Sequence, residues 1–99
     1  MKTRVRNLGG SSNYPKPTCR CGTWIDHWIE NKQIRPGYCR GCGAKTTNLV
    51  GGHVYKVGSF DKQRYIIPIC YSCNNTPGLE FNVDESDLVS ANCNNCKNK

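Results

Sequence analysis

The residues best suited to chemistry in this sequence are eight cysteines that occur in four close pairs. The pairs are Cys19 and Cys21, Cys39 and Cys42, Cys70 and Cys73, and Cys93 and Cys96. Three of the pairs have the CxxC spacing, with which two thiolates of one turn bind the same ion at about 2.3 Å, and the CxC pair can also chelate. Because all-thiolate tetrahedral sites are soft and closed, the four pairs predict two structural Zn²⁺ ions.

Two other uses of the thiols are alternatives to zinc. Four disulfides would suit a small secreted protein, but the basic N-terminus is not followed by an apolar segment of the kind found in a signal peptide. Closely spaced cysteines also have poor geometry for a disulfide and good geometry for a metal-binding turn. An iron–sulfur cluster is a further alternative, since it is also held by four thiolates.

The spacing leaves open which pairs share an ion. Seventeen residues separate Cys21 from Cys39 and nineteen separate Cys73 from Cys93, which suits sequential pairing along the chain. The 27 residues between Cys42 and Cys70 are enough for a β-hairpin between two metal-binding turns. In that nested arrangement the central two pairs share one ion, and the outer two pairs tie the ends together.

The composition explains why such a chain needs metal. Only 36% of the 99 residues are hydrophobic and the mean hydropathy is -0.66, so burial of apolar side chains alone would leave one small domain marginal. No apolar run approaches the roughly 18 residues of a membrane-spanning helix, so we expect no membrane partner. Without a secretory signal, we expect a cytoplasmic protein.

The elements that position the cysteines can be predicted from local patterns. Residues 1–18 are rich in basic residues, Gly, Ser and Pro and predict a flexible basic arm, while residues 19–99 form a single zinc-stapled domain with two four-cysteine sites. Apolar residues at helical spacing from Trp24 to Ile29, with Thr23 as N-cap, predict a short amphipathic helix that ends before Pro36. We expect His27, on this helix, to be structural.

The remainder of the chain predicts short strands. Residues 46–57 indicate a strand with a bulge or a sharp bend at Gly51-Gly52. Residues 64–69 indicate a second strand in which Pro68 marks an edge or an end. These strands form a hairpin that leads into Cys70, and Pro77-Gly78 limits any following helix to about one turn. Residues 79–83 and 88–92 indicate two further strands. The fold class is therefore a small metal-stapled α+β domain with a short N-terminal helix and β-hairpins.

Charge is distributed unevenly along the chain. Residues 1–64 carry 12 Lys or Arg against three acidic residues, whereas residues 65–99 have a net charge of -2. Two four-thiolate zinc sites would lower the overall charge from +7 to about +3. A basic front half is compatible with binding a polyanion, and three tyrosines could stack on bases. The candidate phosphate contacts are Arg20, Arg35, Arg40, Lys45, Lys56 and Arg64, and the candidate stacking residues are Tyr38, Tyr55 and Tyr65.

The central third of the chain resembles the zinc-containing HNH nucleases, a ββα-metal group built on a treble-clef zinc-finger scaffold. The resemblance is carried by CRGC at 39–42, the pair His53-Val54, and IIPICYSCN at 66–74. The flanking segments at 21–28 and 88–92 resemble those of small bacterial and phage proteins with HNH-like domains. The resemblance favours nested zinc pairing, with Cys39, Cys42, Cys70 and Cys73 on one ion.

The same resemblance implies a catalytic arrangement. His53 would be the general base of a metal-dependent endonuclease, Asn74 would occupy the helix-start position, and Mg²⁺ or Mn²⁺ would act on the scissile phosphate. Two departures are evident: Gly52 replaces the family's Asp before the histidine, and Pro77-Gly78 shortens the helix. The sequence therefore predicts a nucleic-acid-binding zinc domain, with DNA as the expected partner, that could act as a phosphodiesterase. The alternative is a non-catalytic zinc scaffold for protein–protein interaction.

Overall fold

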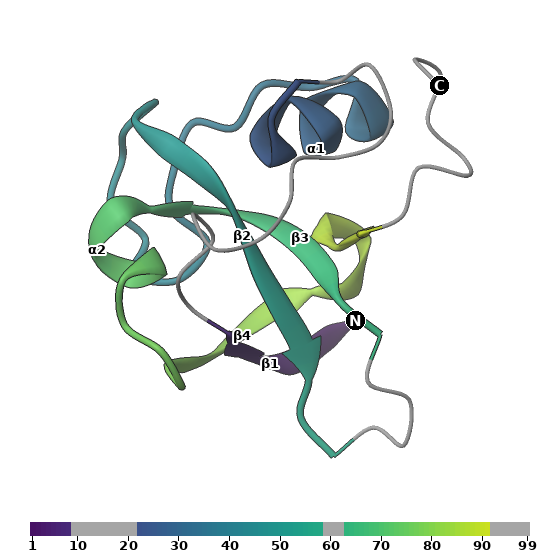
Figure 1. The fold of residues 1–99 in the computed structure, drawn as a ribbon, viewed down its shortest axis with the longest axis vertical. Coiled ribbons are helices and arrows are strands. Elements are labelled where there is room, and N and C mark those ends of the chain that lie inside the picture. The colour runs from purple at the N-terminus through teal and green to yellow at the C-terminus, as the bar shows by residue number, and fades with distance from the viewer. Residues whose placement is uncertain (9–21, 59–62, 92–99) are drawn as a thin grey trace.

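The computed structural model describes residues 1–8, 22–58 and 63–91, which form one antiparallel sheet with helices at its side (Figure 1). The strand order is β4-β1-β2-β3-β5. Helix α1 packs on β2, β3 and β5. The bounds are β1 Lys2–Asn7, α1 Trp24–Lys32, β2 Leu49–Lys56, β3 Tyr65–Cys70, α2 Tyr71–Asn74, β4 Glu80–Asp84, the 3-10 helix η2 Glu85–Asp87, and β5 Val89–Ser90. The predicted α+β class is confirmed.

Strand β1 corrects the expectation of a flexible arm over residues 1–18. It lies inside the sheet, hydrogen-bonded to β2 on one side and β4 on the other. Val5 and Asn7 point into the core while Lys2, Arg4 and Arg6 point outward, the two-residue alternation of a strand. With only two buried side chains, this alternation is too short to stand out from the Gly- and Pro-rich sequence after it. Residues 9–18 lie outside the described part of the chain.

The two faces of the sheet bury different sets of side chains. The larger core is built from Val5, Val54, Ile67, Ile69, Phe81 and Val83 on one face of the sheet, and Leu49, Cys39 and Cys73 join it at the end of the sheet that carries the cysteine cluster. On the opposite face, Trp28 of α1 packs against Ile66 and Val89. The strand alternation therefore decides whether a given side chain faces the metal-binding turns or helix α1.

Helix α1 begins and ends as the sequence predicts. The hydroxyl of Thr23 accepts a hydrogen bond from the backbone N–H of Asp26 at 3.2 Å, which caps the first turn. Gln33 adopts a left-handed conformation (φ 59°) that ends the helix. Trp28 is fully buried, and its indole N–H donates to the carbonyl oxygen of Asp87 at 2.7 Å. This bond fixes the helix to the chain between β4 and β5.

The predicted bulge at Gly51-Gly52 is wrong, because β2 and β3 stay in register across both glycines. What the glycines permit is close packing. A Cβ on Gly51 would lie 2.5 Å from the carbonyl carbon of Trp24, and a Cβ on Gly52 would lie 2.3 Å from Cδ1 of Ile69. The first glycine lets α1 approach the sheet, and the second makes room for an isoleucine in the larger core.

Pro68 lies where β3 has no strand partner on one side. Strand β5 pairs only with Tyr65 and Ile66, so the sheet has a local edge at Pro68, as predicted. Its carbonyl oxygen accepts from the backbone N–H of Arg40 at 3.0 Å, on that same side of the strand. The missing N–H of proline therefore costs the sheet no hydrogen bond. The bond from Arg40 joins β3 to the turn that carries Cys39 and Cys42, which is called the first metal-binding turn below.

Helix α2 is a single turn, as Pro77-Gly78 predicts, and β1 holds its end. The side-chain amide of Asn7 is buried and donates to three carbonyl oxygens, those of Cys73 (2.8 Å), Asn74 (3.2 Å) and Thr76 (3.0 Å). Cys73 and Asn74 form the end of α2, and Thr76 lies just after it. The first strand of the chain thus secures the turn that carries Cys73. Among the described residues, no helix is long and apolar enough to cross a membrane.

Candidate metal centre

Four cysteines from two distant segments converge at one end of the β2–β3 hairpin. Cys39 and Cys42 lie in the turn before β2, Cys70 ends β3, and Cys73 lies in α2. Their four Sγ atoms all lie within 4.8 Å of one another. The distance is 3.7 Å between the Sγ atoms of Cys39 and Cys73, and 3.8 Å between those of Cys42 and Cys70. The two central cysteine pairs therefore lie together, as in the nested arrangement.

The distances match what a tetrahedral zinc ion requires. With Zn–S bonds of about 2.3 Å, the sulfur atoms of a regular tetrahedron lie about 3.8 Å apart. All four thiols are free, and each approaches the other three, whereas disulfides would draw them together in two separate pairs. The donor set is soft and supplies four ligands, so this cluster is suited to one structural zinc ion.

Backbone donors prepare Cys39 to be a thiolate. The backbone N–H groups of Gly41, Cys42 and Cys70 donate to its Sγ at 3.3, 3.4 and 3.3 Å. Burial alone would raise the pKa of the Cys39 thiol, but these three donors lower that pKa to about 6. Burial, with the neighbouring thiols, raises the pKa of Cys73. Deprotonating Cys73 therefore depends on a cation between the sulfurs, which is what metal binding supplies.

The other four predicted zinc ligands lie outside the described residues. They are Cys19, Cys21, Cys93 and Cys96. The described residues resume at Gly22, just before α1, and stop at Ala91, just after β5. Helix α1 and strand β5 contact each other. His27 of α1 and the carbonyl oxygen of Ser90 in β5 are joined by a 2.9 Å hydrogen bond to Nε2. This bond and the full burial of His27 agree with the structural role expected for that histidine.

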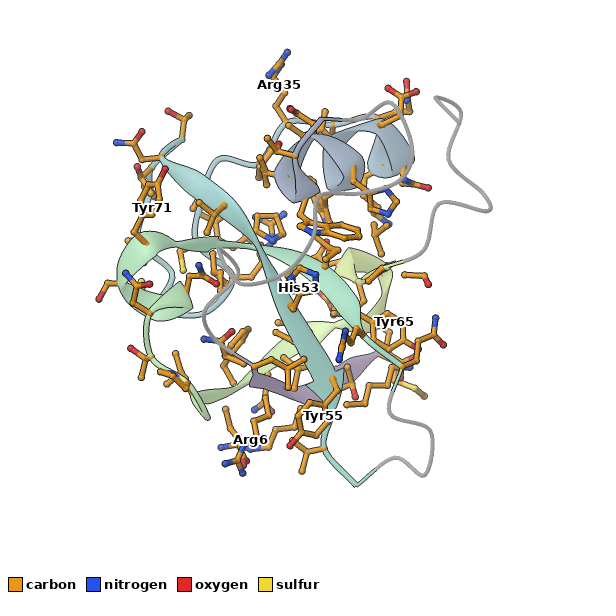
Figure 2. All side chains as sticks on the ribbon, viewed as in Figure 1. Arg6, Arg35, His53, Tyr55, Tyr65 and Tyr71 are labelled. Carbon is orange, nitrogen blue, oxygen red and sulfur yellow. The ribbon has the colours of Figure 1, made fainter. Side chains whose placement is uncertain are left out.

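His53, the predicted general base, is buried under helix α1. It is 2% exposed, and its ring packs edge-on against the ring of Trp24 with centroids 4.9 Å apart. Figure 2 shows His53 near the centre of the molecule, below helix α1 in this view. Burial, with a smaller contribution from the positive charge of Arg64, lowers the pKa of His53 to about 4. The side chain is therefore neutral at pH 7 and shielded from solvent.

Asn74, the second catalytic candidate, lies on the opposite side of the sheet. It is buried, and a Cβ on Gly52 would lie 3.5 Å from its Oδ1. Successive side chains of a strand point to opposite faces of the sheet. Gly52 faces Asn74, so the next residue, His53, lies on the opposite face. The structure therefore does not bring His53 and Asn74 together. An aspartate at position 52 would also meet Ile69 rather than a phosphate.

Folding pairs much of the basic front half with the acidic back half. On the outer face of β1 and β4, Lys2 lies 3.5 Å from Asp84, and Arg4 and Arg6 lie 2.9 and 3.6 Å from Glu80. These ion pairs lie between residues about 80 positions apart in sequence. The uneven charge along the chain thus becomes a mixed surface on this face of the folded sheet.

The six predicted phosphate contacts separate into three groups. Arg20 lies outside the described residues. Two are held by carboxylates: the Arg40 side chain is only 8% exposed and lies 3.2 Å from Asp87, and Lys56 lies 3.7 Å from Glu85. Three are exposed, namely Arg35, Lys45 and Arg64. Figure 2 shows Arg35 projecting from the molecule beyond α1.

Two tyrosines are exposed beside the cysteine cluster. Tyr38 precedes Cys39 and is 46% exposed. Tyr71, which is labelled in Figure 2, follows Cys70 and is 61% exposed. Tyr55 and Tyr65, predicted as stacking residues, are only partly exposed. The sequence reasoning missed Tyr71. Its position between the ligands of a CxxC turn was an available signal, because those intervening side chains must point away from the metal.

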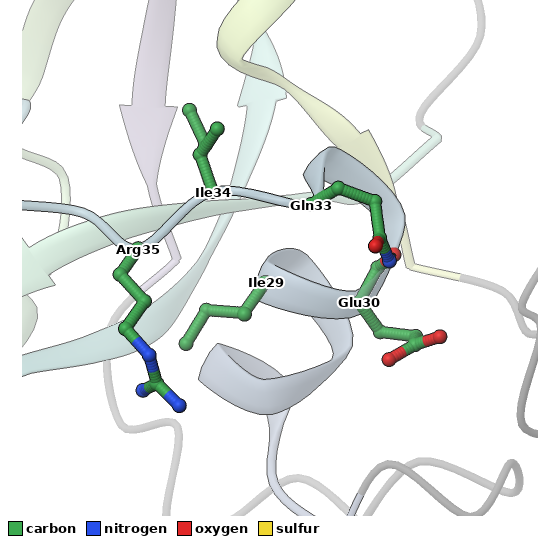
Figure 3. Close-up of a pocket in the computed structure, with 5 residues that line it drawn as sticks. All are labelled: Ile29, Glu30, Gln33, Ile34 and Arg35. Atoms are coloured by element: carbon green, nitrogen blue, oxygen red, sulfur yellow. The ribbon is translucent and has the colours of Figure 1, made fainter.

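An open hollow of about 240 Å³ lies between α1 and the segment that follows it (Figure 3). Ile29 and Glu30 of the helix line it together with Gln33, Ile34 and Arg35 of the following segment. Ile34 is 53% exposed. The hollow therefore offers a small apolar surface beside a charged residue of each sign.

The fold and the cluster define a small α+β domain with a five-stranded antiparallel sheet and a four-cysteine site suited to a metal ion. Comparison with protein-family models, with curated proteins and with solved structures found no match for the chain. The resemblance to HNH nucleases therefore rests on the sequence motifs alone, and of its implications the structure bears out the grouping of Cys39, Cys42, Cys70 and Cys73.

Proposed function

We propose that this protein is a non-catalytic zinc domain that binds nucleic acid through the surface of its first metal-binding turn. The observation that carries the proposal is the setting of Tyr38, an exposed aromatic ring beside the exposed cation Lys45. The two residues are paired across a short antiparallel bridge, flanked by hydrogen bonds from Cys39 N–H to Ala44 O (2.9 Å) and from Thr46 N–H to Gly37 O (3.2 Å). In such a non-hydrogen-bonded pair the side chains lie side by side.

The sequence around this turn lacks carboxylates that would repel phosphate. No Asp or Glu occurs between residues 31 and 60, or between residues 62 and 79. Arg35 and Lys45 are exposed on this stretch, so an approaching phosphate meets cations rather than the mixed charges of β1 and β4. Phosphate contacts of this kind supply affinity without sequence information.

Zinc would be the structural cofactor of the domain. One ion at Cys39, Cys42, Cys70 and Cys73 would join the first turn to the hairpin and to α2, on a treble-clef plan. By elimination the second ion would take Cys19, Cys21, Cys93 and Cys96. In the sequence these cysteines precede α1 and follow β5, and those two elements are hydrogen-bonded to each other. The free thiols of the described cluster suit a reducing compartment such as the cytoplasm.

The proposed function does not include nuclease activity, because of where two residues lie. A general base must come within hydrogen-bond reach of its water, and His53 is buried against Trp24. The position that would supply a carboxylate for Mg²⁺ or Mn²⁺ is Gly52, whose Cβ space is filled by Ile69. Binding is thus the activity that the exposed residues support.

The test is a binding titration with zinc-loaded protein. Fluorescence anisotropy of labelled 20-nucleotide DNA and RNA, single-stranded and duplex, is measured from 25 to 300 mM salt. We expect binding that weakens with salt, and we expect Lys45→Gln to lower the affinity and reduce the slope of log K against log salt by about 0.7 to 0.9.

The matched control is Lys2→Gln, which removes a cation that is already paired with Asp84 on the outer face of the sheet. It should leave the slope unchanged. Absence of binding by folded, zinc-loaded protein at 25 mM salt would refute the proposal. Cleavage of the same strands on addition of Mg²⁺ or Mn²⁺, lost in His53→Ala, would instead restore the endonuclease.

A protein-interaction scaffold is the second candidate, and the exposed Ile34 in the hollow beside α1 favours it. Large apolar side chains gathered on a surface are typical of contact sites. If nucleic acid fails to bind, this surface is where a protein partner should be sought, with Ile34→Ser as the disrupting variant.

A further inference from the structure

We infer that the nucleic acid bound at the first metal-binding turn is single-stranded, and that one of its bases stacks on the ring of Tyr38. This inference rests on the proposed function and names the class of ligand. In a duplex the faces of the bases are covered by their neighbours, whereas an unpaired base can be laid on an aromatic side chain. What favours stacking here is the way in which Tyr38 is held.

Tyr38 is braced from one side by an immobilised arginine. The guanidinium carbon of Arg40 lies 3.9 Å from the centroid of the Tyr38 ring and 5.6 Å from that of Trp28. Arg40 also donates to the carbonyl oxygen of Tyr38 at 2.9 Å and to the carboxylate of Asp87 at 3.2 Å. The Arg40 side chain is 8% exposed, so it is part of the folded structure rather than a free surface cation.

Bracing leaves one face of the ring for a ligand. Arg40 covers one face of the ring and 46% of Tyr38 is exposed, so we expect a ligand to reach the ring from the opposite face. A fixed ring loses little conformational entropy on binding, and the cation behind it is held in place before the base arrives. Tyr71 is more exposed, but no bond or ring contact of this kind holds it among the described residues.

Among the described residues, the segment that carries Tyr38 has few exposed cations for a site that works by charge alone. Between residues 31 and 58 the exposed cations are Arg35 and Lys45, and a four-thiolate zinc site carries a net charge of -2. Two phosphate contacts on a single strand predict a slope of log K against log salt of only about -1.4. The affinity must therefore come mainly from stacking, which every base can provide.

The experiment compares 12-nucleotide oligo-dT and oligo-U with a 12-base-pair duplex, using anisotropy and zinc-loaded protein. We expect both single strands to bind more tightly than the duplex. Tyr38→Ala should weaken single-strand binding about 5- to 100-fold, and Tyr38→Phe, which keeps the ring, should retain most of it. Tyr71→Ala is the control for an unbraced exposed tyrosine and should have little effect. Zinc content and dispersion of the NMR spectrum establish that each variant is folded.

A second readout does not depend on a variant. The ring protons of Tyr38 should shift upfield on addition of oligo-dT, because a stacked base shields them. Equal binding of duplex and single strand, or single-strand binding that Tyr38→Ala leaves intact, would overturn the inference while the proposed function stands. No binding of any nucleic acid would overturn both.

Discussion

At the scale of single residues, His53 shows how burial changes what a histidine does. A strand places its ring between the sheet and Trp24, where solvent cannot reach it. Desolvation disfavours the charged form, so the folded protein takes up a proton on His53 only near pH 4. The unfolded chain takes it up at the ordinary pKa of 6.5. This difference makes the histidine a source of acid sensitivity.

The sign of the effect follows from proton binding. Between pH 6.5 and pH 4 the unfolded state binds more protons at this site than the folded state, so the free energy of unfolding falls as the pH is lowered. Relative to His53→Leu, the natural protein should lose about 2 kcal/mol of stability between pH 7 and pH 5. Urea unfolding of both proteins at the two pH values measures this, and the contribution of the cysteines cancels in the difference.

Arg64 supplies the matched variant for that measurement. The positive charge of Arg64 also lowers the pKa of His53, so Arg64→Gln should bring that pKa closer to its value in the unfolded chain. The variant should then lose less stability at pH 5 than the natural protein does. If the stability of the natural protein and that of His53→Leu depended equally on pH, the pKa of His53 would be the same in the folded and unfolded states, which would contradict this prediction.

At the scale of elements, the two adjacent glycines of β2 determine how closely α1 approaches the sheet. Gly51 faces backbone, the carbonyl carbon of Trp24 and the amide nitrogen of Ile25, whereas Gly52 faces the end of the Ile69 side chain. A side chain can change rotamer, but a capped helix held by Trp28 can move only as a body. The same small addition should therefore have different costs at the two positions.

We expect Gly52→Ala to destabilise the protein by about 1 to 3 kcal/mol, the usual cost of overpacking a core. Gly51→Ala should cost more than about 3 kcal/mol, because α1 must be displaced from β2. Chemical denaturation of the two variants gives both values, and the near-UV signal of Trp24 and Trp28 reports displacement of the helix. Gly51→Ala no less stable than Gly52→Ala would contradict the close approach of α1.

At the scale of the whole molecule, a metal ion in the cysteine cluster would take the place of a larger apolar core. The cluster joins the turn before β2, the end of β3 and α2, and Cys39 and Cys73 are themselves part of the buried core. Without an ion, four thiols whose Sγ atoms lie within 4.8 Å of one another would have to stay neutral or repel one another. Metal binding and folding should therefore be coupled.

A strong chelator should consequently unfold the protein. We expect the CD signal and the dispersion of the amide NMR spectrum to collapse when the metal is removed, and to return when Zn²⁺ is restored. Reductant alone should have no effect. If the spectrum survives the chelator and is lost with reductant, disulfides rather than zinc hold the fold.

The number of ions tests the second site directly. Native mass spectrometry should find two zinc ions per chain, and one in Cys93→Ser/Cys96→Ser. The matched variant Cys42→Ser/Cys70→Ser should lose the other ion and should disrupt the hairpin end of the fold. A single ion in the natural protein, retained in the Cys93→Ser/Cys96→Ser variant, would remove the second site from the proposal.

Local signals in the sequence were enough for several features. The N-cap at Thr23, the extent of α1, the single turn of α2 and the edge position of Pro68 each depend on residues within about one turn or on one chemical property, such as the missing N–H of proline. The spacing of the cysteines likewise shows that they act in pairs, because a CxxC turn brings two thiols together without help from the remainder of the chain.

Other features depended on contacts between distant segments, and only the tertiary structure decided them. Strand β1 joins the sheet because Val5 and Asn7 fit a core built by residues about 50 to 80 positions away. The face of β2 on which His53 lies, the ion pair that holds Arg40 and the sharing of one site by Cys39 and Cys73 arise in the same way. Spacing along a chain fixes what a residue can reach locally, but burial and long-range pairing decide what it meets.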